Sequence, residues 1–216
     1  MIYATMCIGD KWIQKHKESI IGFGKNNKLF VLTDNPNEFL ECNTIKYERD
    51  IFSYYEKINL VLNLLLKYKE RVTYIDADWI GSYDTNHNLD DNSLYVYNIF
   101  SLDEPPMIYY FDENTKKYIQ EISKTNIGDW YIPEAIISFP YLENIDDIKE
   151  DFDNLQIPIE NGSSVFYKED STKRYESIGI GYGEGWAITS VVIKHKLKVK
   201  TFEEFSTKTW RKIGLI

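Results

Sequence analysis

The sequence contains few cysteines and no segment that looks like an export signal. Cys7 and Cys42 are the two cysteines of the 216 residues, and neither belongs to a spacing typical of metal sites. A reduced, cytoplasmic chain is therefore the expected state. The chain begins with strand-like residues rather than with a charged region followed by a long apolar one, so we expect no signal peptide.

The sequence also lacks long apolar runs and an excess of positive charge. Its apolar runs are far shorter than the roughly 18 residues that a membrane-spanning helix needs, so we expect a soluble protein without a transmembrane segment. With 25 basic and 34 acidic residues, the net charge is −9. A general nucleic-acid-binding protein is not expected, because no overall positive field would attract phosphate backbones. A local basic patch remains compatible with this charge.

Aromatic residues, in contrast, are abundant. The 17 tyrosines and five tryptophans exceed what a core needs, because each carries a polar end that requires water or a partner. Two explanations stay open, an aromatic-lined sugar or nucleotide site and an AT-rich coding bias. The length and the hydrophobic content of 43% suit one large α/β domain that spans residues 1–216.

Short apolar segments alternate with amphipathic ones along the chain. We expect strands at residues 2–8, 28–33, 44–47, 72–75, 94–100 and 135–139, with 107–111 as a hairpin partner of 94–100. We expect helices near residues 12–21, 53–65, 116–124, 146–155 and 186–195. This alternation predicts an α/β fold of the Rossmann-like kind, with a mainly parallel central sheet and helices on both faces. In such sheets, ligands bind beyond the carboxyl ends of the strands.

Two aspartates separated by one residue, Asp76 and Asp78, follow the apolar run 72–75. Alternation along an extended chain places both carboxylates on the same side. They repel each other unless one is protonated or a cation lies between them, and a hard ion such as Mg²⁺ or Mn²⁺ could also hold substrate phosphates. The alternative is an acidic turn after a strand. Gly9-Asp10 and Asp34-Asn35 also fall at strand ends, which favours the metal site.

The clearest helix signal begins at Ser53. The sequence Ser53-Tyr-Tyr-Glu56 is typical of a capping box, in which the serine oxygen accepts a hydrogen bond from a free amide and Glu56 reaches back. Apolar residues then recur at helical spacing, as Tyr54, Ile58, Val61, Leu62 and Leu65. Lys57, in the first turn, faces the same strand ends and could contact a phosphate. An ordinary surface lysine is the alternative.

The second half of the chain offers weaker signals. Trp130, Tyr131 and Glu134 combine flat apolar faces with a carboxylate, an arrangement that holds sugars, although this segment taken alone favours a core tryptophan beside a loop glutamate. Glu184 lies in a glycine-rich stretch before a helix, without the spacing of a dinucleotide fingerprint. The basic tail 207–212 either folds over a diphosphate or is solvated.

Several of these motifs, taken in order, resemble a known family. The first strand ends near Gly9-Asp10, the second strand ends in Val31-Leu-Thr-Asp-Asn-Pro36, Lys57 lies in the following helix, and Tyr-Ile-Asp-Ala-Asp78 comes next. The sequence resembles the GT-A fold of nucleotide-sugar glycosyltransferases, and most closely the small bacterial or phage relatives of the ABO blood-group transferase family. The resemblance is good over residues 1–80 and looser at 130–134 and 183–188.

The resemblance implies a donor site in residues 1–80, the nucleotide-binding half, and an acceptor-side half with a C-terminal tail in 81–216. Asp76 and Asp78 would hold Mn²⁺ or Mg²⁺ against the donor diphosphate. The implied donor-binding residues are Thr5, Ile8, Asp34, Asn35, Lys57, Asp76 and, closing over the diphosphate, Lys208, Arg211 and Lys212. The implied sugar and acceptor residues are Trp130, Tyr131, Glu134 and Glu184.

By the same resemblance, the chain would move a sugar from a nucleotide-sugar donor, a UDP-sugar by preference, to a carbohydrate or other hydroxyl acceptor. Glu184 or Glu134 would stabilise the oxocarbenium-like carbon, attack it, or take the acceptor proton. Retaining transfer is preferred, although Gly183 stands where the blood-group enzymes carry the first acid of an Asp-Glu pair. A catalytically inactive nucleotide-sugar-binding module is the alternative. A phosphatase or nucleotidyltransferase is disfavoured, because Ile80 and Gly81-Ser82 do not match their motifs.

Overall fold

The computed structural model describes residues 1–97, 100–101, 113–128, 130–133, 135–156, 165–168 and 183–202. The strands of its main sheet are β1 (Ile2–Met6), β2 (Leu29–Thr33), β3 (Asn43–Lys46), β5 (Val72–Ile75), β6 (Ser93–Val96), β9 (Ile136–Phe139) and β11 (Lys198–Thr201). The helices are α1 (Asp10–Gly24), α2 (Tyr55–Tyr68), α3 (Glu113–Ser123), α4 (Ile145–Asp153) and α5 (Gly183–Lys194), with short 3-10 turns η1 (Pro36–Phe39) and η2 (Ile80–Ser82). Two small ribbons join β4 (Ile51–Ser53) to β10 (Val165–Tyr167) and β7 (Phe100–Ser101) to β8 (Trp130–Tyr131).

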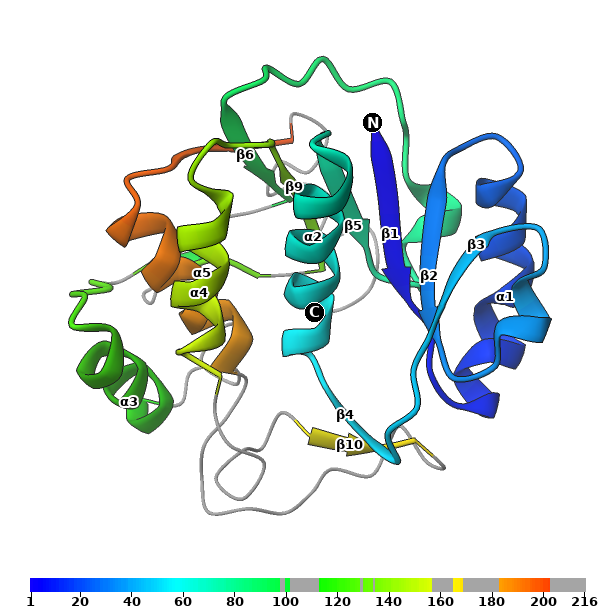
Figure 1. Ribbon diagram of the computed structural model, residues 1–216, viewed down its shortest axis with the longest axis horizontal. Coiled ribbons are helices and arrows are strands. Elements are labelled where there is room, and N and C mark those ends of the chain that lie inside the picture. Colours follow the sequence, from blue (N-terminus) through cyan, green and yellow to red (C-terminus); the bar gives the residue numbers. More distant parts are fainter. Residues whose placement is uncertain are drawn as a thin grey trace.

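The seven-stranded sheet has the order β11-β6-β9-β5-β1-β2-β3 (Figure 1). β1 pairs in parallel with β2 and β5, β2 with β3, and β6 with β11. β9 alone among the paired strands of this sheet is antiparallel, to β5 on one side and β6 on the other. The predicted α/β fold with a mainly parallel central sheet is therefore confirmed, and the reversed strand is an addition to it.

Helices cover both faces of the sheet. On one face, the Tyr3 ring of β1 packs edge-on against Phe23 of α1, with the ring centroids 5.1 Å apart. Tyr3 is the register partner of Leu29, so the next residue of β2, Phe30, points to the opposite face. There Phe30 contacts Tyr68 of α2 at 5.3 Å between centroids. The predicted placement of helices on both faces is thus confirmed.

The order of the strands creates a switch point between β1 and β5. From β1 the chain continues to β2 and β3 on one side, and α2 then returns it to β5 on the other side of β1. The segments that follow β1 and β5 therefore lead away from the carboxyl ends of these strands, and the space beyond the ends can receive a ligand. The β4–β10 ribbon lies beyond this end of the sheet, below it in Figure 1.

Two local predictions were wrong. Helix α2 begins at Tyr55 rather than Ser53, because Ser53 ends β4 and pairs with Val165. The Ser53 hydroxyl accepts a hydrogen bond from the Tyr55 N–H at 3.1 Å, but Glu56 pairs with the Arg49 guanidinium at 3.7 Å instead of closing a capping box. The single strand expected at 94–100 is also wrong, because β6 ends at Val96 and the chain bends at residue 97. The segment 107–111 lies outside the described residues.

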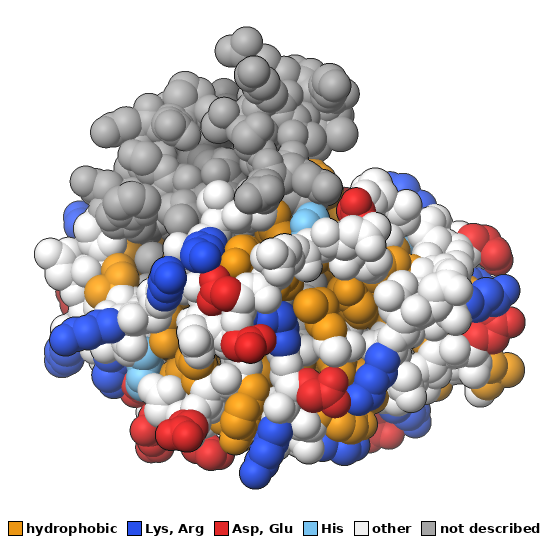
Figure 2. All heavy atoms as spheres, turned by 90° about the horizontal axis from the view of Figure 1, so that it is seen from above, with side chains coloured by type: hydrophobic (Ala, Val, Ile, Leu, Met, Phe, Trp, Pro, Cys, Tyr) orange, Lys and Arg blue, Asp and Glu red, His pale blue; other side chains and the backbone are white. Residues whose placement is uncertain are grey.

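Charges of both signs are mixed on the surface of the described part. Figure 2 shows Lys and Arg side chains interspersed with Asp and Glu side chains on one face, with apolar side chains between them. Ion pairs join many charged side chains of the described surface, such as Lys17 with Glu38 at 2.6 Å and Lys28 with Glu70 at 3.1 Å. None of the helices within the described ranges has the length and apolar character needed to cross a bilayer.

Candidate functional site

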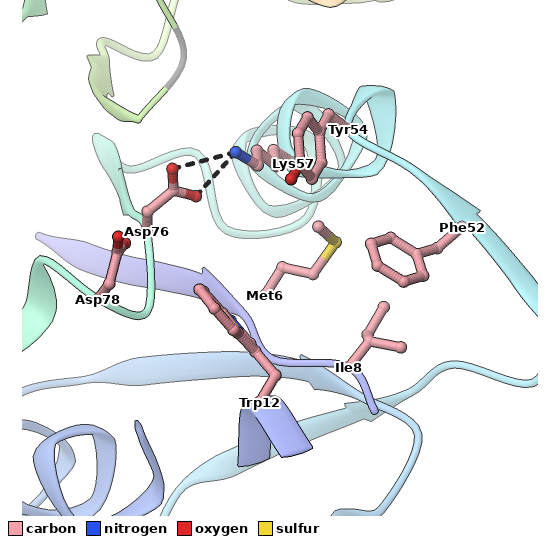
Figure 3. Close-up of a pocket in the computed structure, with 8 residues that line it drawn as sticks. All are labelled: Met6, Ile8, Trp12, Phe52, Tyr54, Lys57, Asp76 and Asp78. Atoms are coloured by element: carbon pink, nitrogen blue, oxygen red, sulfur yellow. Dashed lines mark hydrogen bonds and ion pairs between the residues drawn. The ribbon is translucent and has the colours of Figure 1, made fainter. Parts of the chain in front are cut away.

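A pocket of about 200 Å³ lies at the carboxyl ends of β1 and β5. It is lined by Met6, Ile8, Trp12, Phe52, Tyr54, Lys57, Asp76 and Asp78 (Figure 3). These residues come from four parts of the fold: the end of β1, the start of α1, the β4–α2 junction and the segment after β5. The pocket thus occupies the switch point where an open α/β sheet binds ligands.

A buried ion pair stands inside the pocket. The Lys57 Nζ lies 2.9 Å from Oδ1 and 3.1 Å from Oδ2 of Asp76, and the Tyr74 hydroxyl donates to Oδ1 at 2.8 Å. Lys57 is only 5% exposed, and its ammonium lies 4.1 Å from the centroid of the Tyr54 ring. Lys57 is therefore a site residue rather than a solvated surface lysine.

The ionisation of Asp76 reflects competing effects. Burial raises the pKa of the Asp76 carboxyl, the Lys57 ammonium opposes this rise, and the negative charge of Asp78 adds to it. The net direction is upward, although 22% of the side chain stays exposed. A carboxylate in this state gains from any further positive charge that reaches its open side.

Asp78 is the more accessible of the two carboxylates. The backbone turns directly after β5, since the Trp79 and Ile80 N–H groups both donate to the Asp76 carbonyl, at 2.9 and 3.2 Å. This turn leaves the Asp78 side chain exposed at the edge of the pocket, on the same side as Asp76 (Figure 3). Carboxylate oxygens with access to water and to phosphate oxygens are the ligands that Mg²⁺ prefers.

The two aspartates do not form a complete metal cage by themselves. Within the described ranges, no group of three or more His, Cys, Asp and Glu side chains is placed to hold an ion. A cation at Asp78 would need further oxygens from water or from a bound substrate, which is the usual situation of Mg²⁺ beside phosphates.

Aromatic and apolar side chains make the rest of the pocket wall. Phe52 and Tyr54 both stack on Phe166 of β10, at 5.5 and 4.6 Å between ring centroids. On the α1 side, Trp12 packs on His16 at 4.3 Å. Flat rings held in this way suit the faces of a nucleobase or a sugar.

The sequence reasoning missed Met6, Trp12, Phe52 and Tyr54 as pocket residues. Their apolar character and helical or strand spacing are also those of core residues. The one sequence signal that could have identified them is their position beside the strand ends.

The other residues expected to bind the donor are placed differently. Ile8 lines the pocket, but Thr5 is fully buried in β1, and its hydroxyl has no hydrogen-bond partner among the described residues. Asp34 accepts a hydrogen bond from the Gly9 N–H at 3.0 Å, and the Asn35 N–H donates to the Thr33 hydroxyl. Neither Asp34 nor Asn35 is among the residues that line the pocket, so in this structure they shape the strand ends around it.

Tyr131 and the start of α5, which carries Glu184, lie together in a second aromatic cluster. The Tyr131 ring packs against Trp186 at 5.0 Å and covers Gly185 so closely that a Cβ there would come within 2.3 Å of it. Lys116 of α3, which the sequence reasoning missed, lies 5.6 Å from the Trp186 ring centroid. Glu184 is 0% exposed and does not line the pocket of Asp76.

The remaining predicted site residues lie outside the described part. These are Glu134, Lys208, Arg211 and Lys212, together with the side chain of Trp130, whose backbone belongs to β8. No family model and no curated protein matches the chain. We therefore infer the function from the pocket and from the residues that line it.

Proposed function

We propose that the chain is a metal-dependent glycosyltransferase that takes a sugar from a nucleotide-sugar donor, a UDP-sugar by preference, and transfers it to a carbohydrate or other hydroxyl acceptor. The observation that carries this proposal is the composition of the switch-point pocket. A solvent-exposed Asp78, the Lys57–Asp76 pair and three aromatic side chains surround one space. A nucleoside diphosphate carries the matching groups, namely a flat base, a ribose and two phosphates.

The residues present fit a hard divalent cation. Asp78 offers an accessible carboxylate, and Asp76 is a buried carboxyl whose pKa is raised, so both would be stabilised by positive charge. Mn²⁺ or Mg²⁺ held there would neutralise charge on the departing diphosphate. Trp12, Phe52 and Tyr54 would hold the base or the sugar by their faces, and Lys57 would add a second positive charge beside the phosphates.

The acceptor side of the proposal depends on Glu184 and Glu134. Either carboxylate could stabilise the oxocarbenium-like carbon, attack it in a retaining reaction, or take the acceptor proton. Trp130 and Tyr131 are proposed to hold the sugar. A reduced, cytoplasmic setting is part of the same proposal and follows from the low cysteine content.

One observation favours a second candidate function, a nucleotide-sugar-binding module without transfer activity. Glu184 is fully buried at the start of α5, a helix that packs against α3 and β8. A carboxylate without exposed surface cannot touch a sugar unless the surrounding segments move. The two candidates share the donor pocket and differ in whether the bound donor reacts.

The test is donor hydrolysis. The purified chain is incubated with Mn²⁺ and a panel of UDP- and GDP-sugars, and free nucleoside diphosphate is measured. We expect slow release with one class of donor, loss of release in the Asp78→Asn variant, and wild-type release in the control Asp147→Asn. Asp147 is an exposed aspartate in the first turn of α4, away from the pocket lining.

The outcomes separate the candidates. Donor binding by calorimetry without any release supports the binding module. Release that persists without metal, or equally in Asp78→Asn, contradicts the proposed role of the aspartates.

A further inference from the structure

The Lys57 ammonium contacts both carboxylate oxygens of Asp76, the atoms with which Asp76 would ligate a cation. Both Asp76 oxygens are within hydrogen-bond distance of Nζ, at 2.9 and 3.1 Å, and Oδ1 also accepts from the Tyr74 hydroxyl (Figure 3). An ion ligated by Asp76 would lie about 2.1 Å from one of these oxygens. It would then stand within about 5 Å of the lysine charge, where like charges repel strongly.

Aromatic rings restrict how far Lys57 can move away. The ammonium lies 4.1 Å from the Tyr54 ring centroid and 5.8 Å from that of Tyr74, and the side chain is almost completely buried. Such cation–π contacts stabilise the Lys57 ammonium in its present position. A second lysine, Lys15, lies 5.3 Å from the ring centroid of Trp12, which lines the same pocket, but Lys15 is not itself a lining residue.

We propose that Lys57 is a built-in competitor of the divalent cation, which keeps the ion from binding to the empty pocket and makes it enter together with an anionic diphosphate. Among the described residues that line the pocket, Asp76, Asp78 and Lys57 sum to one net negative charge, too little to hold a strongly hydrated ion tightly. The arriving diphosphate supplies oxygens for the ion and for Lys57 at once. The joint entry of the ion and a diphosphate rests on the proposed function, whereas the competition of Lys57 for Asp76 does not.

The experiment measures Mn²⁺ binding directly, by electron paramagnetic resonance of free Mn²⁺, without donor turnover. We expect weak binding to the wild type, binding at least about tenfold tighter to Lys57→Met, and a similar tightening when UDP is added to the wild type. Lys28→Met is the matched control. It removes the same charge from the chain, but its partner Glu70 lies beyond α2, at the other end of the sheet from the pocket. It should bind Mn²⁺ as the wild type does.

The double variant Lys57→Met/Asp76→Asn tests whether Lys57 and Mn²⁺ compete for Asp76. Without the Asp76 carboxylate, the gain in Mn²⁺ affinity caused by Lys57→Met should disappear. If Lys57→Met does not fold, thermal unfolding of the wild type decides. Mn²⁺ alone should leave the Tm unchanged, and Mn²⁺ with UDP should raise it more than UDP alone.

Two results overturn the proposal: equal Mn²⁺ affinity of folded Lys57→Met and wild type, or tight Mn²⁺ binding by the wild type alone. Failure of every donor to hydrolyse would contradict the proposed transferase but would leave the Mn²⁺ measurements, and the competition of Lys57 for Asp76, untouched.

Discussion

Asp34 accepts a hydrogen bond from the backbone N–H of Gly9, at 3.0 Å, and thereby joins the ends of β1 and β2 beside the pocket. Gly9 adopts φ +89°, a conformation that L side chains rarely take. The carbonyl of Lys168, the residue after β10, closes over the same position. Gly9 therefore lies where two strand ends and the β4–β10 ribbon come together beside the site, and this backbone unit leaves no room for a side chain.

The first prediction concerns this unit. Gly9→Ala should lower the free energy of unfolding by roughly 1–3 kcal/mol, because the residue keeps a left-handed φ and its Cβ would lie 2.6 Å from the Lys168 carbonyl oxygen. Gly22→Ala is the matched control. It lies within α1, and apart from the backbone of the helix itself no described atom comes within 4 Å of the new Cβ, so the substitution should stabilise the fold by about 0.5–1 kcal/mol. Urea unfolding of both variants measures the difference, and equal effects would contradict the argument.

The second prediction concerns the attachment of α5 to the strand β8. The buried Thr189 hydroxyl accepts a hydrogen bond from the Ile132 N–H at 2.9 Å and donates to the Gly185 carbonyl at 2.6 Å. Thr189→Val should destabilise the fold by about 1–3 kcal/mol, because the Ile132 N–H would be buried without an acceptor. Thr189→Ser keeps the hydroxyl, so its free energy of unfolding, measured by chemical unfolding, should fall less than that of Thr189→Val. A Val variant as stable as the Ser variant would show that the hydrogen bond is unimportant.

Most of the fold could be predicted from the sequence, because its signals are local. Apolar runs bounded by turn residues marked the strands of the sheet except β11, and helical spacing marked α1 and α2. The antiparallel direction of β9 could not be predicted in this way. It depends on pairing with β5 and β6, more than 35 residues away along the chain, and no local pattern encodes such a pairing.

The pocket residues that could be predicted are charged residues whose place in the sequence puts them at the carboxyl ends of the strands. Asp76, Asp78 and Lys57 were expected at one sheet edge and line one pocket. The ion pair between Lys57 and Asp76 was not expected, because side-chain partners depend on how α2 docks on β5. Trp12 and Phe52 were missed for a different reason, since an aromatic residue in a pocket wall has the same sequence pattern as one in the core.

The third prediction concerns thiol reactivity. Burial, together with the nearby charge of Asp34, raises the pKa of the Cys7 thiol to about 12. The thiolate is the reactive form, so Cys7 should stay unmodified when the native chain is treated with iodoacetamide at pH 8. Cys42 is only partly buried and should react first. Peptide mass spectrometry distinguishes the two sites, and rapid native labelling of Cys7 would mean that the end of β1 opens readily.

The fourth prediction concerns pH and the helix that carries Trp12. Burial and the nearby Lys15 charge lower the pKa of His16, and the opposing effect of Asp78 is smaller. The folded state therefore binds this proton less readily than the unfolded state, where the histidine pKa is about 6.5. The resulting stability is complete above that pH and is lost as the pH falls through the folded-state value. Wild type should lose more free energy of unfolding between pH 7.5 and 5.5 than His16→Phe, which keeps a ring against Trp12 but cannot titrate. Parallel pH profiles in urea unfolding would show that His16 is solvated in the folded chain.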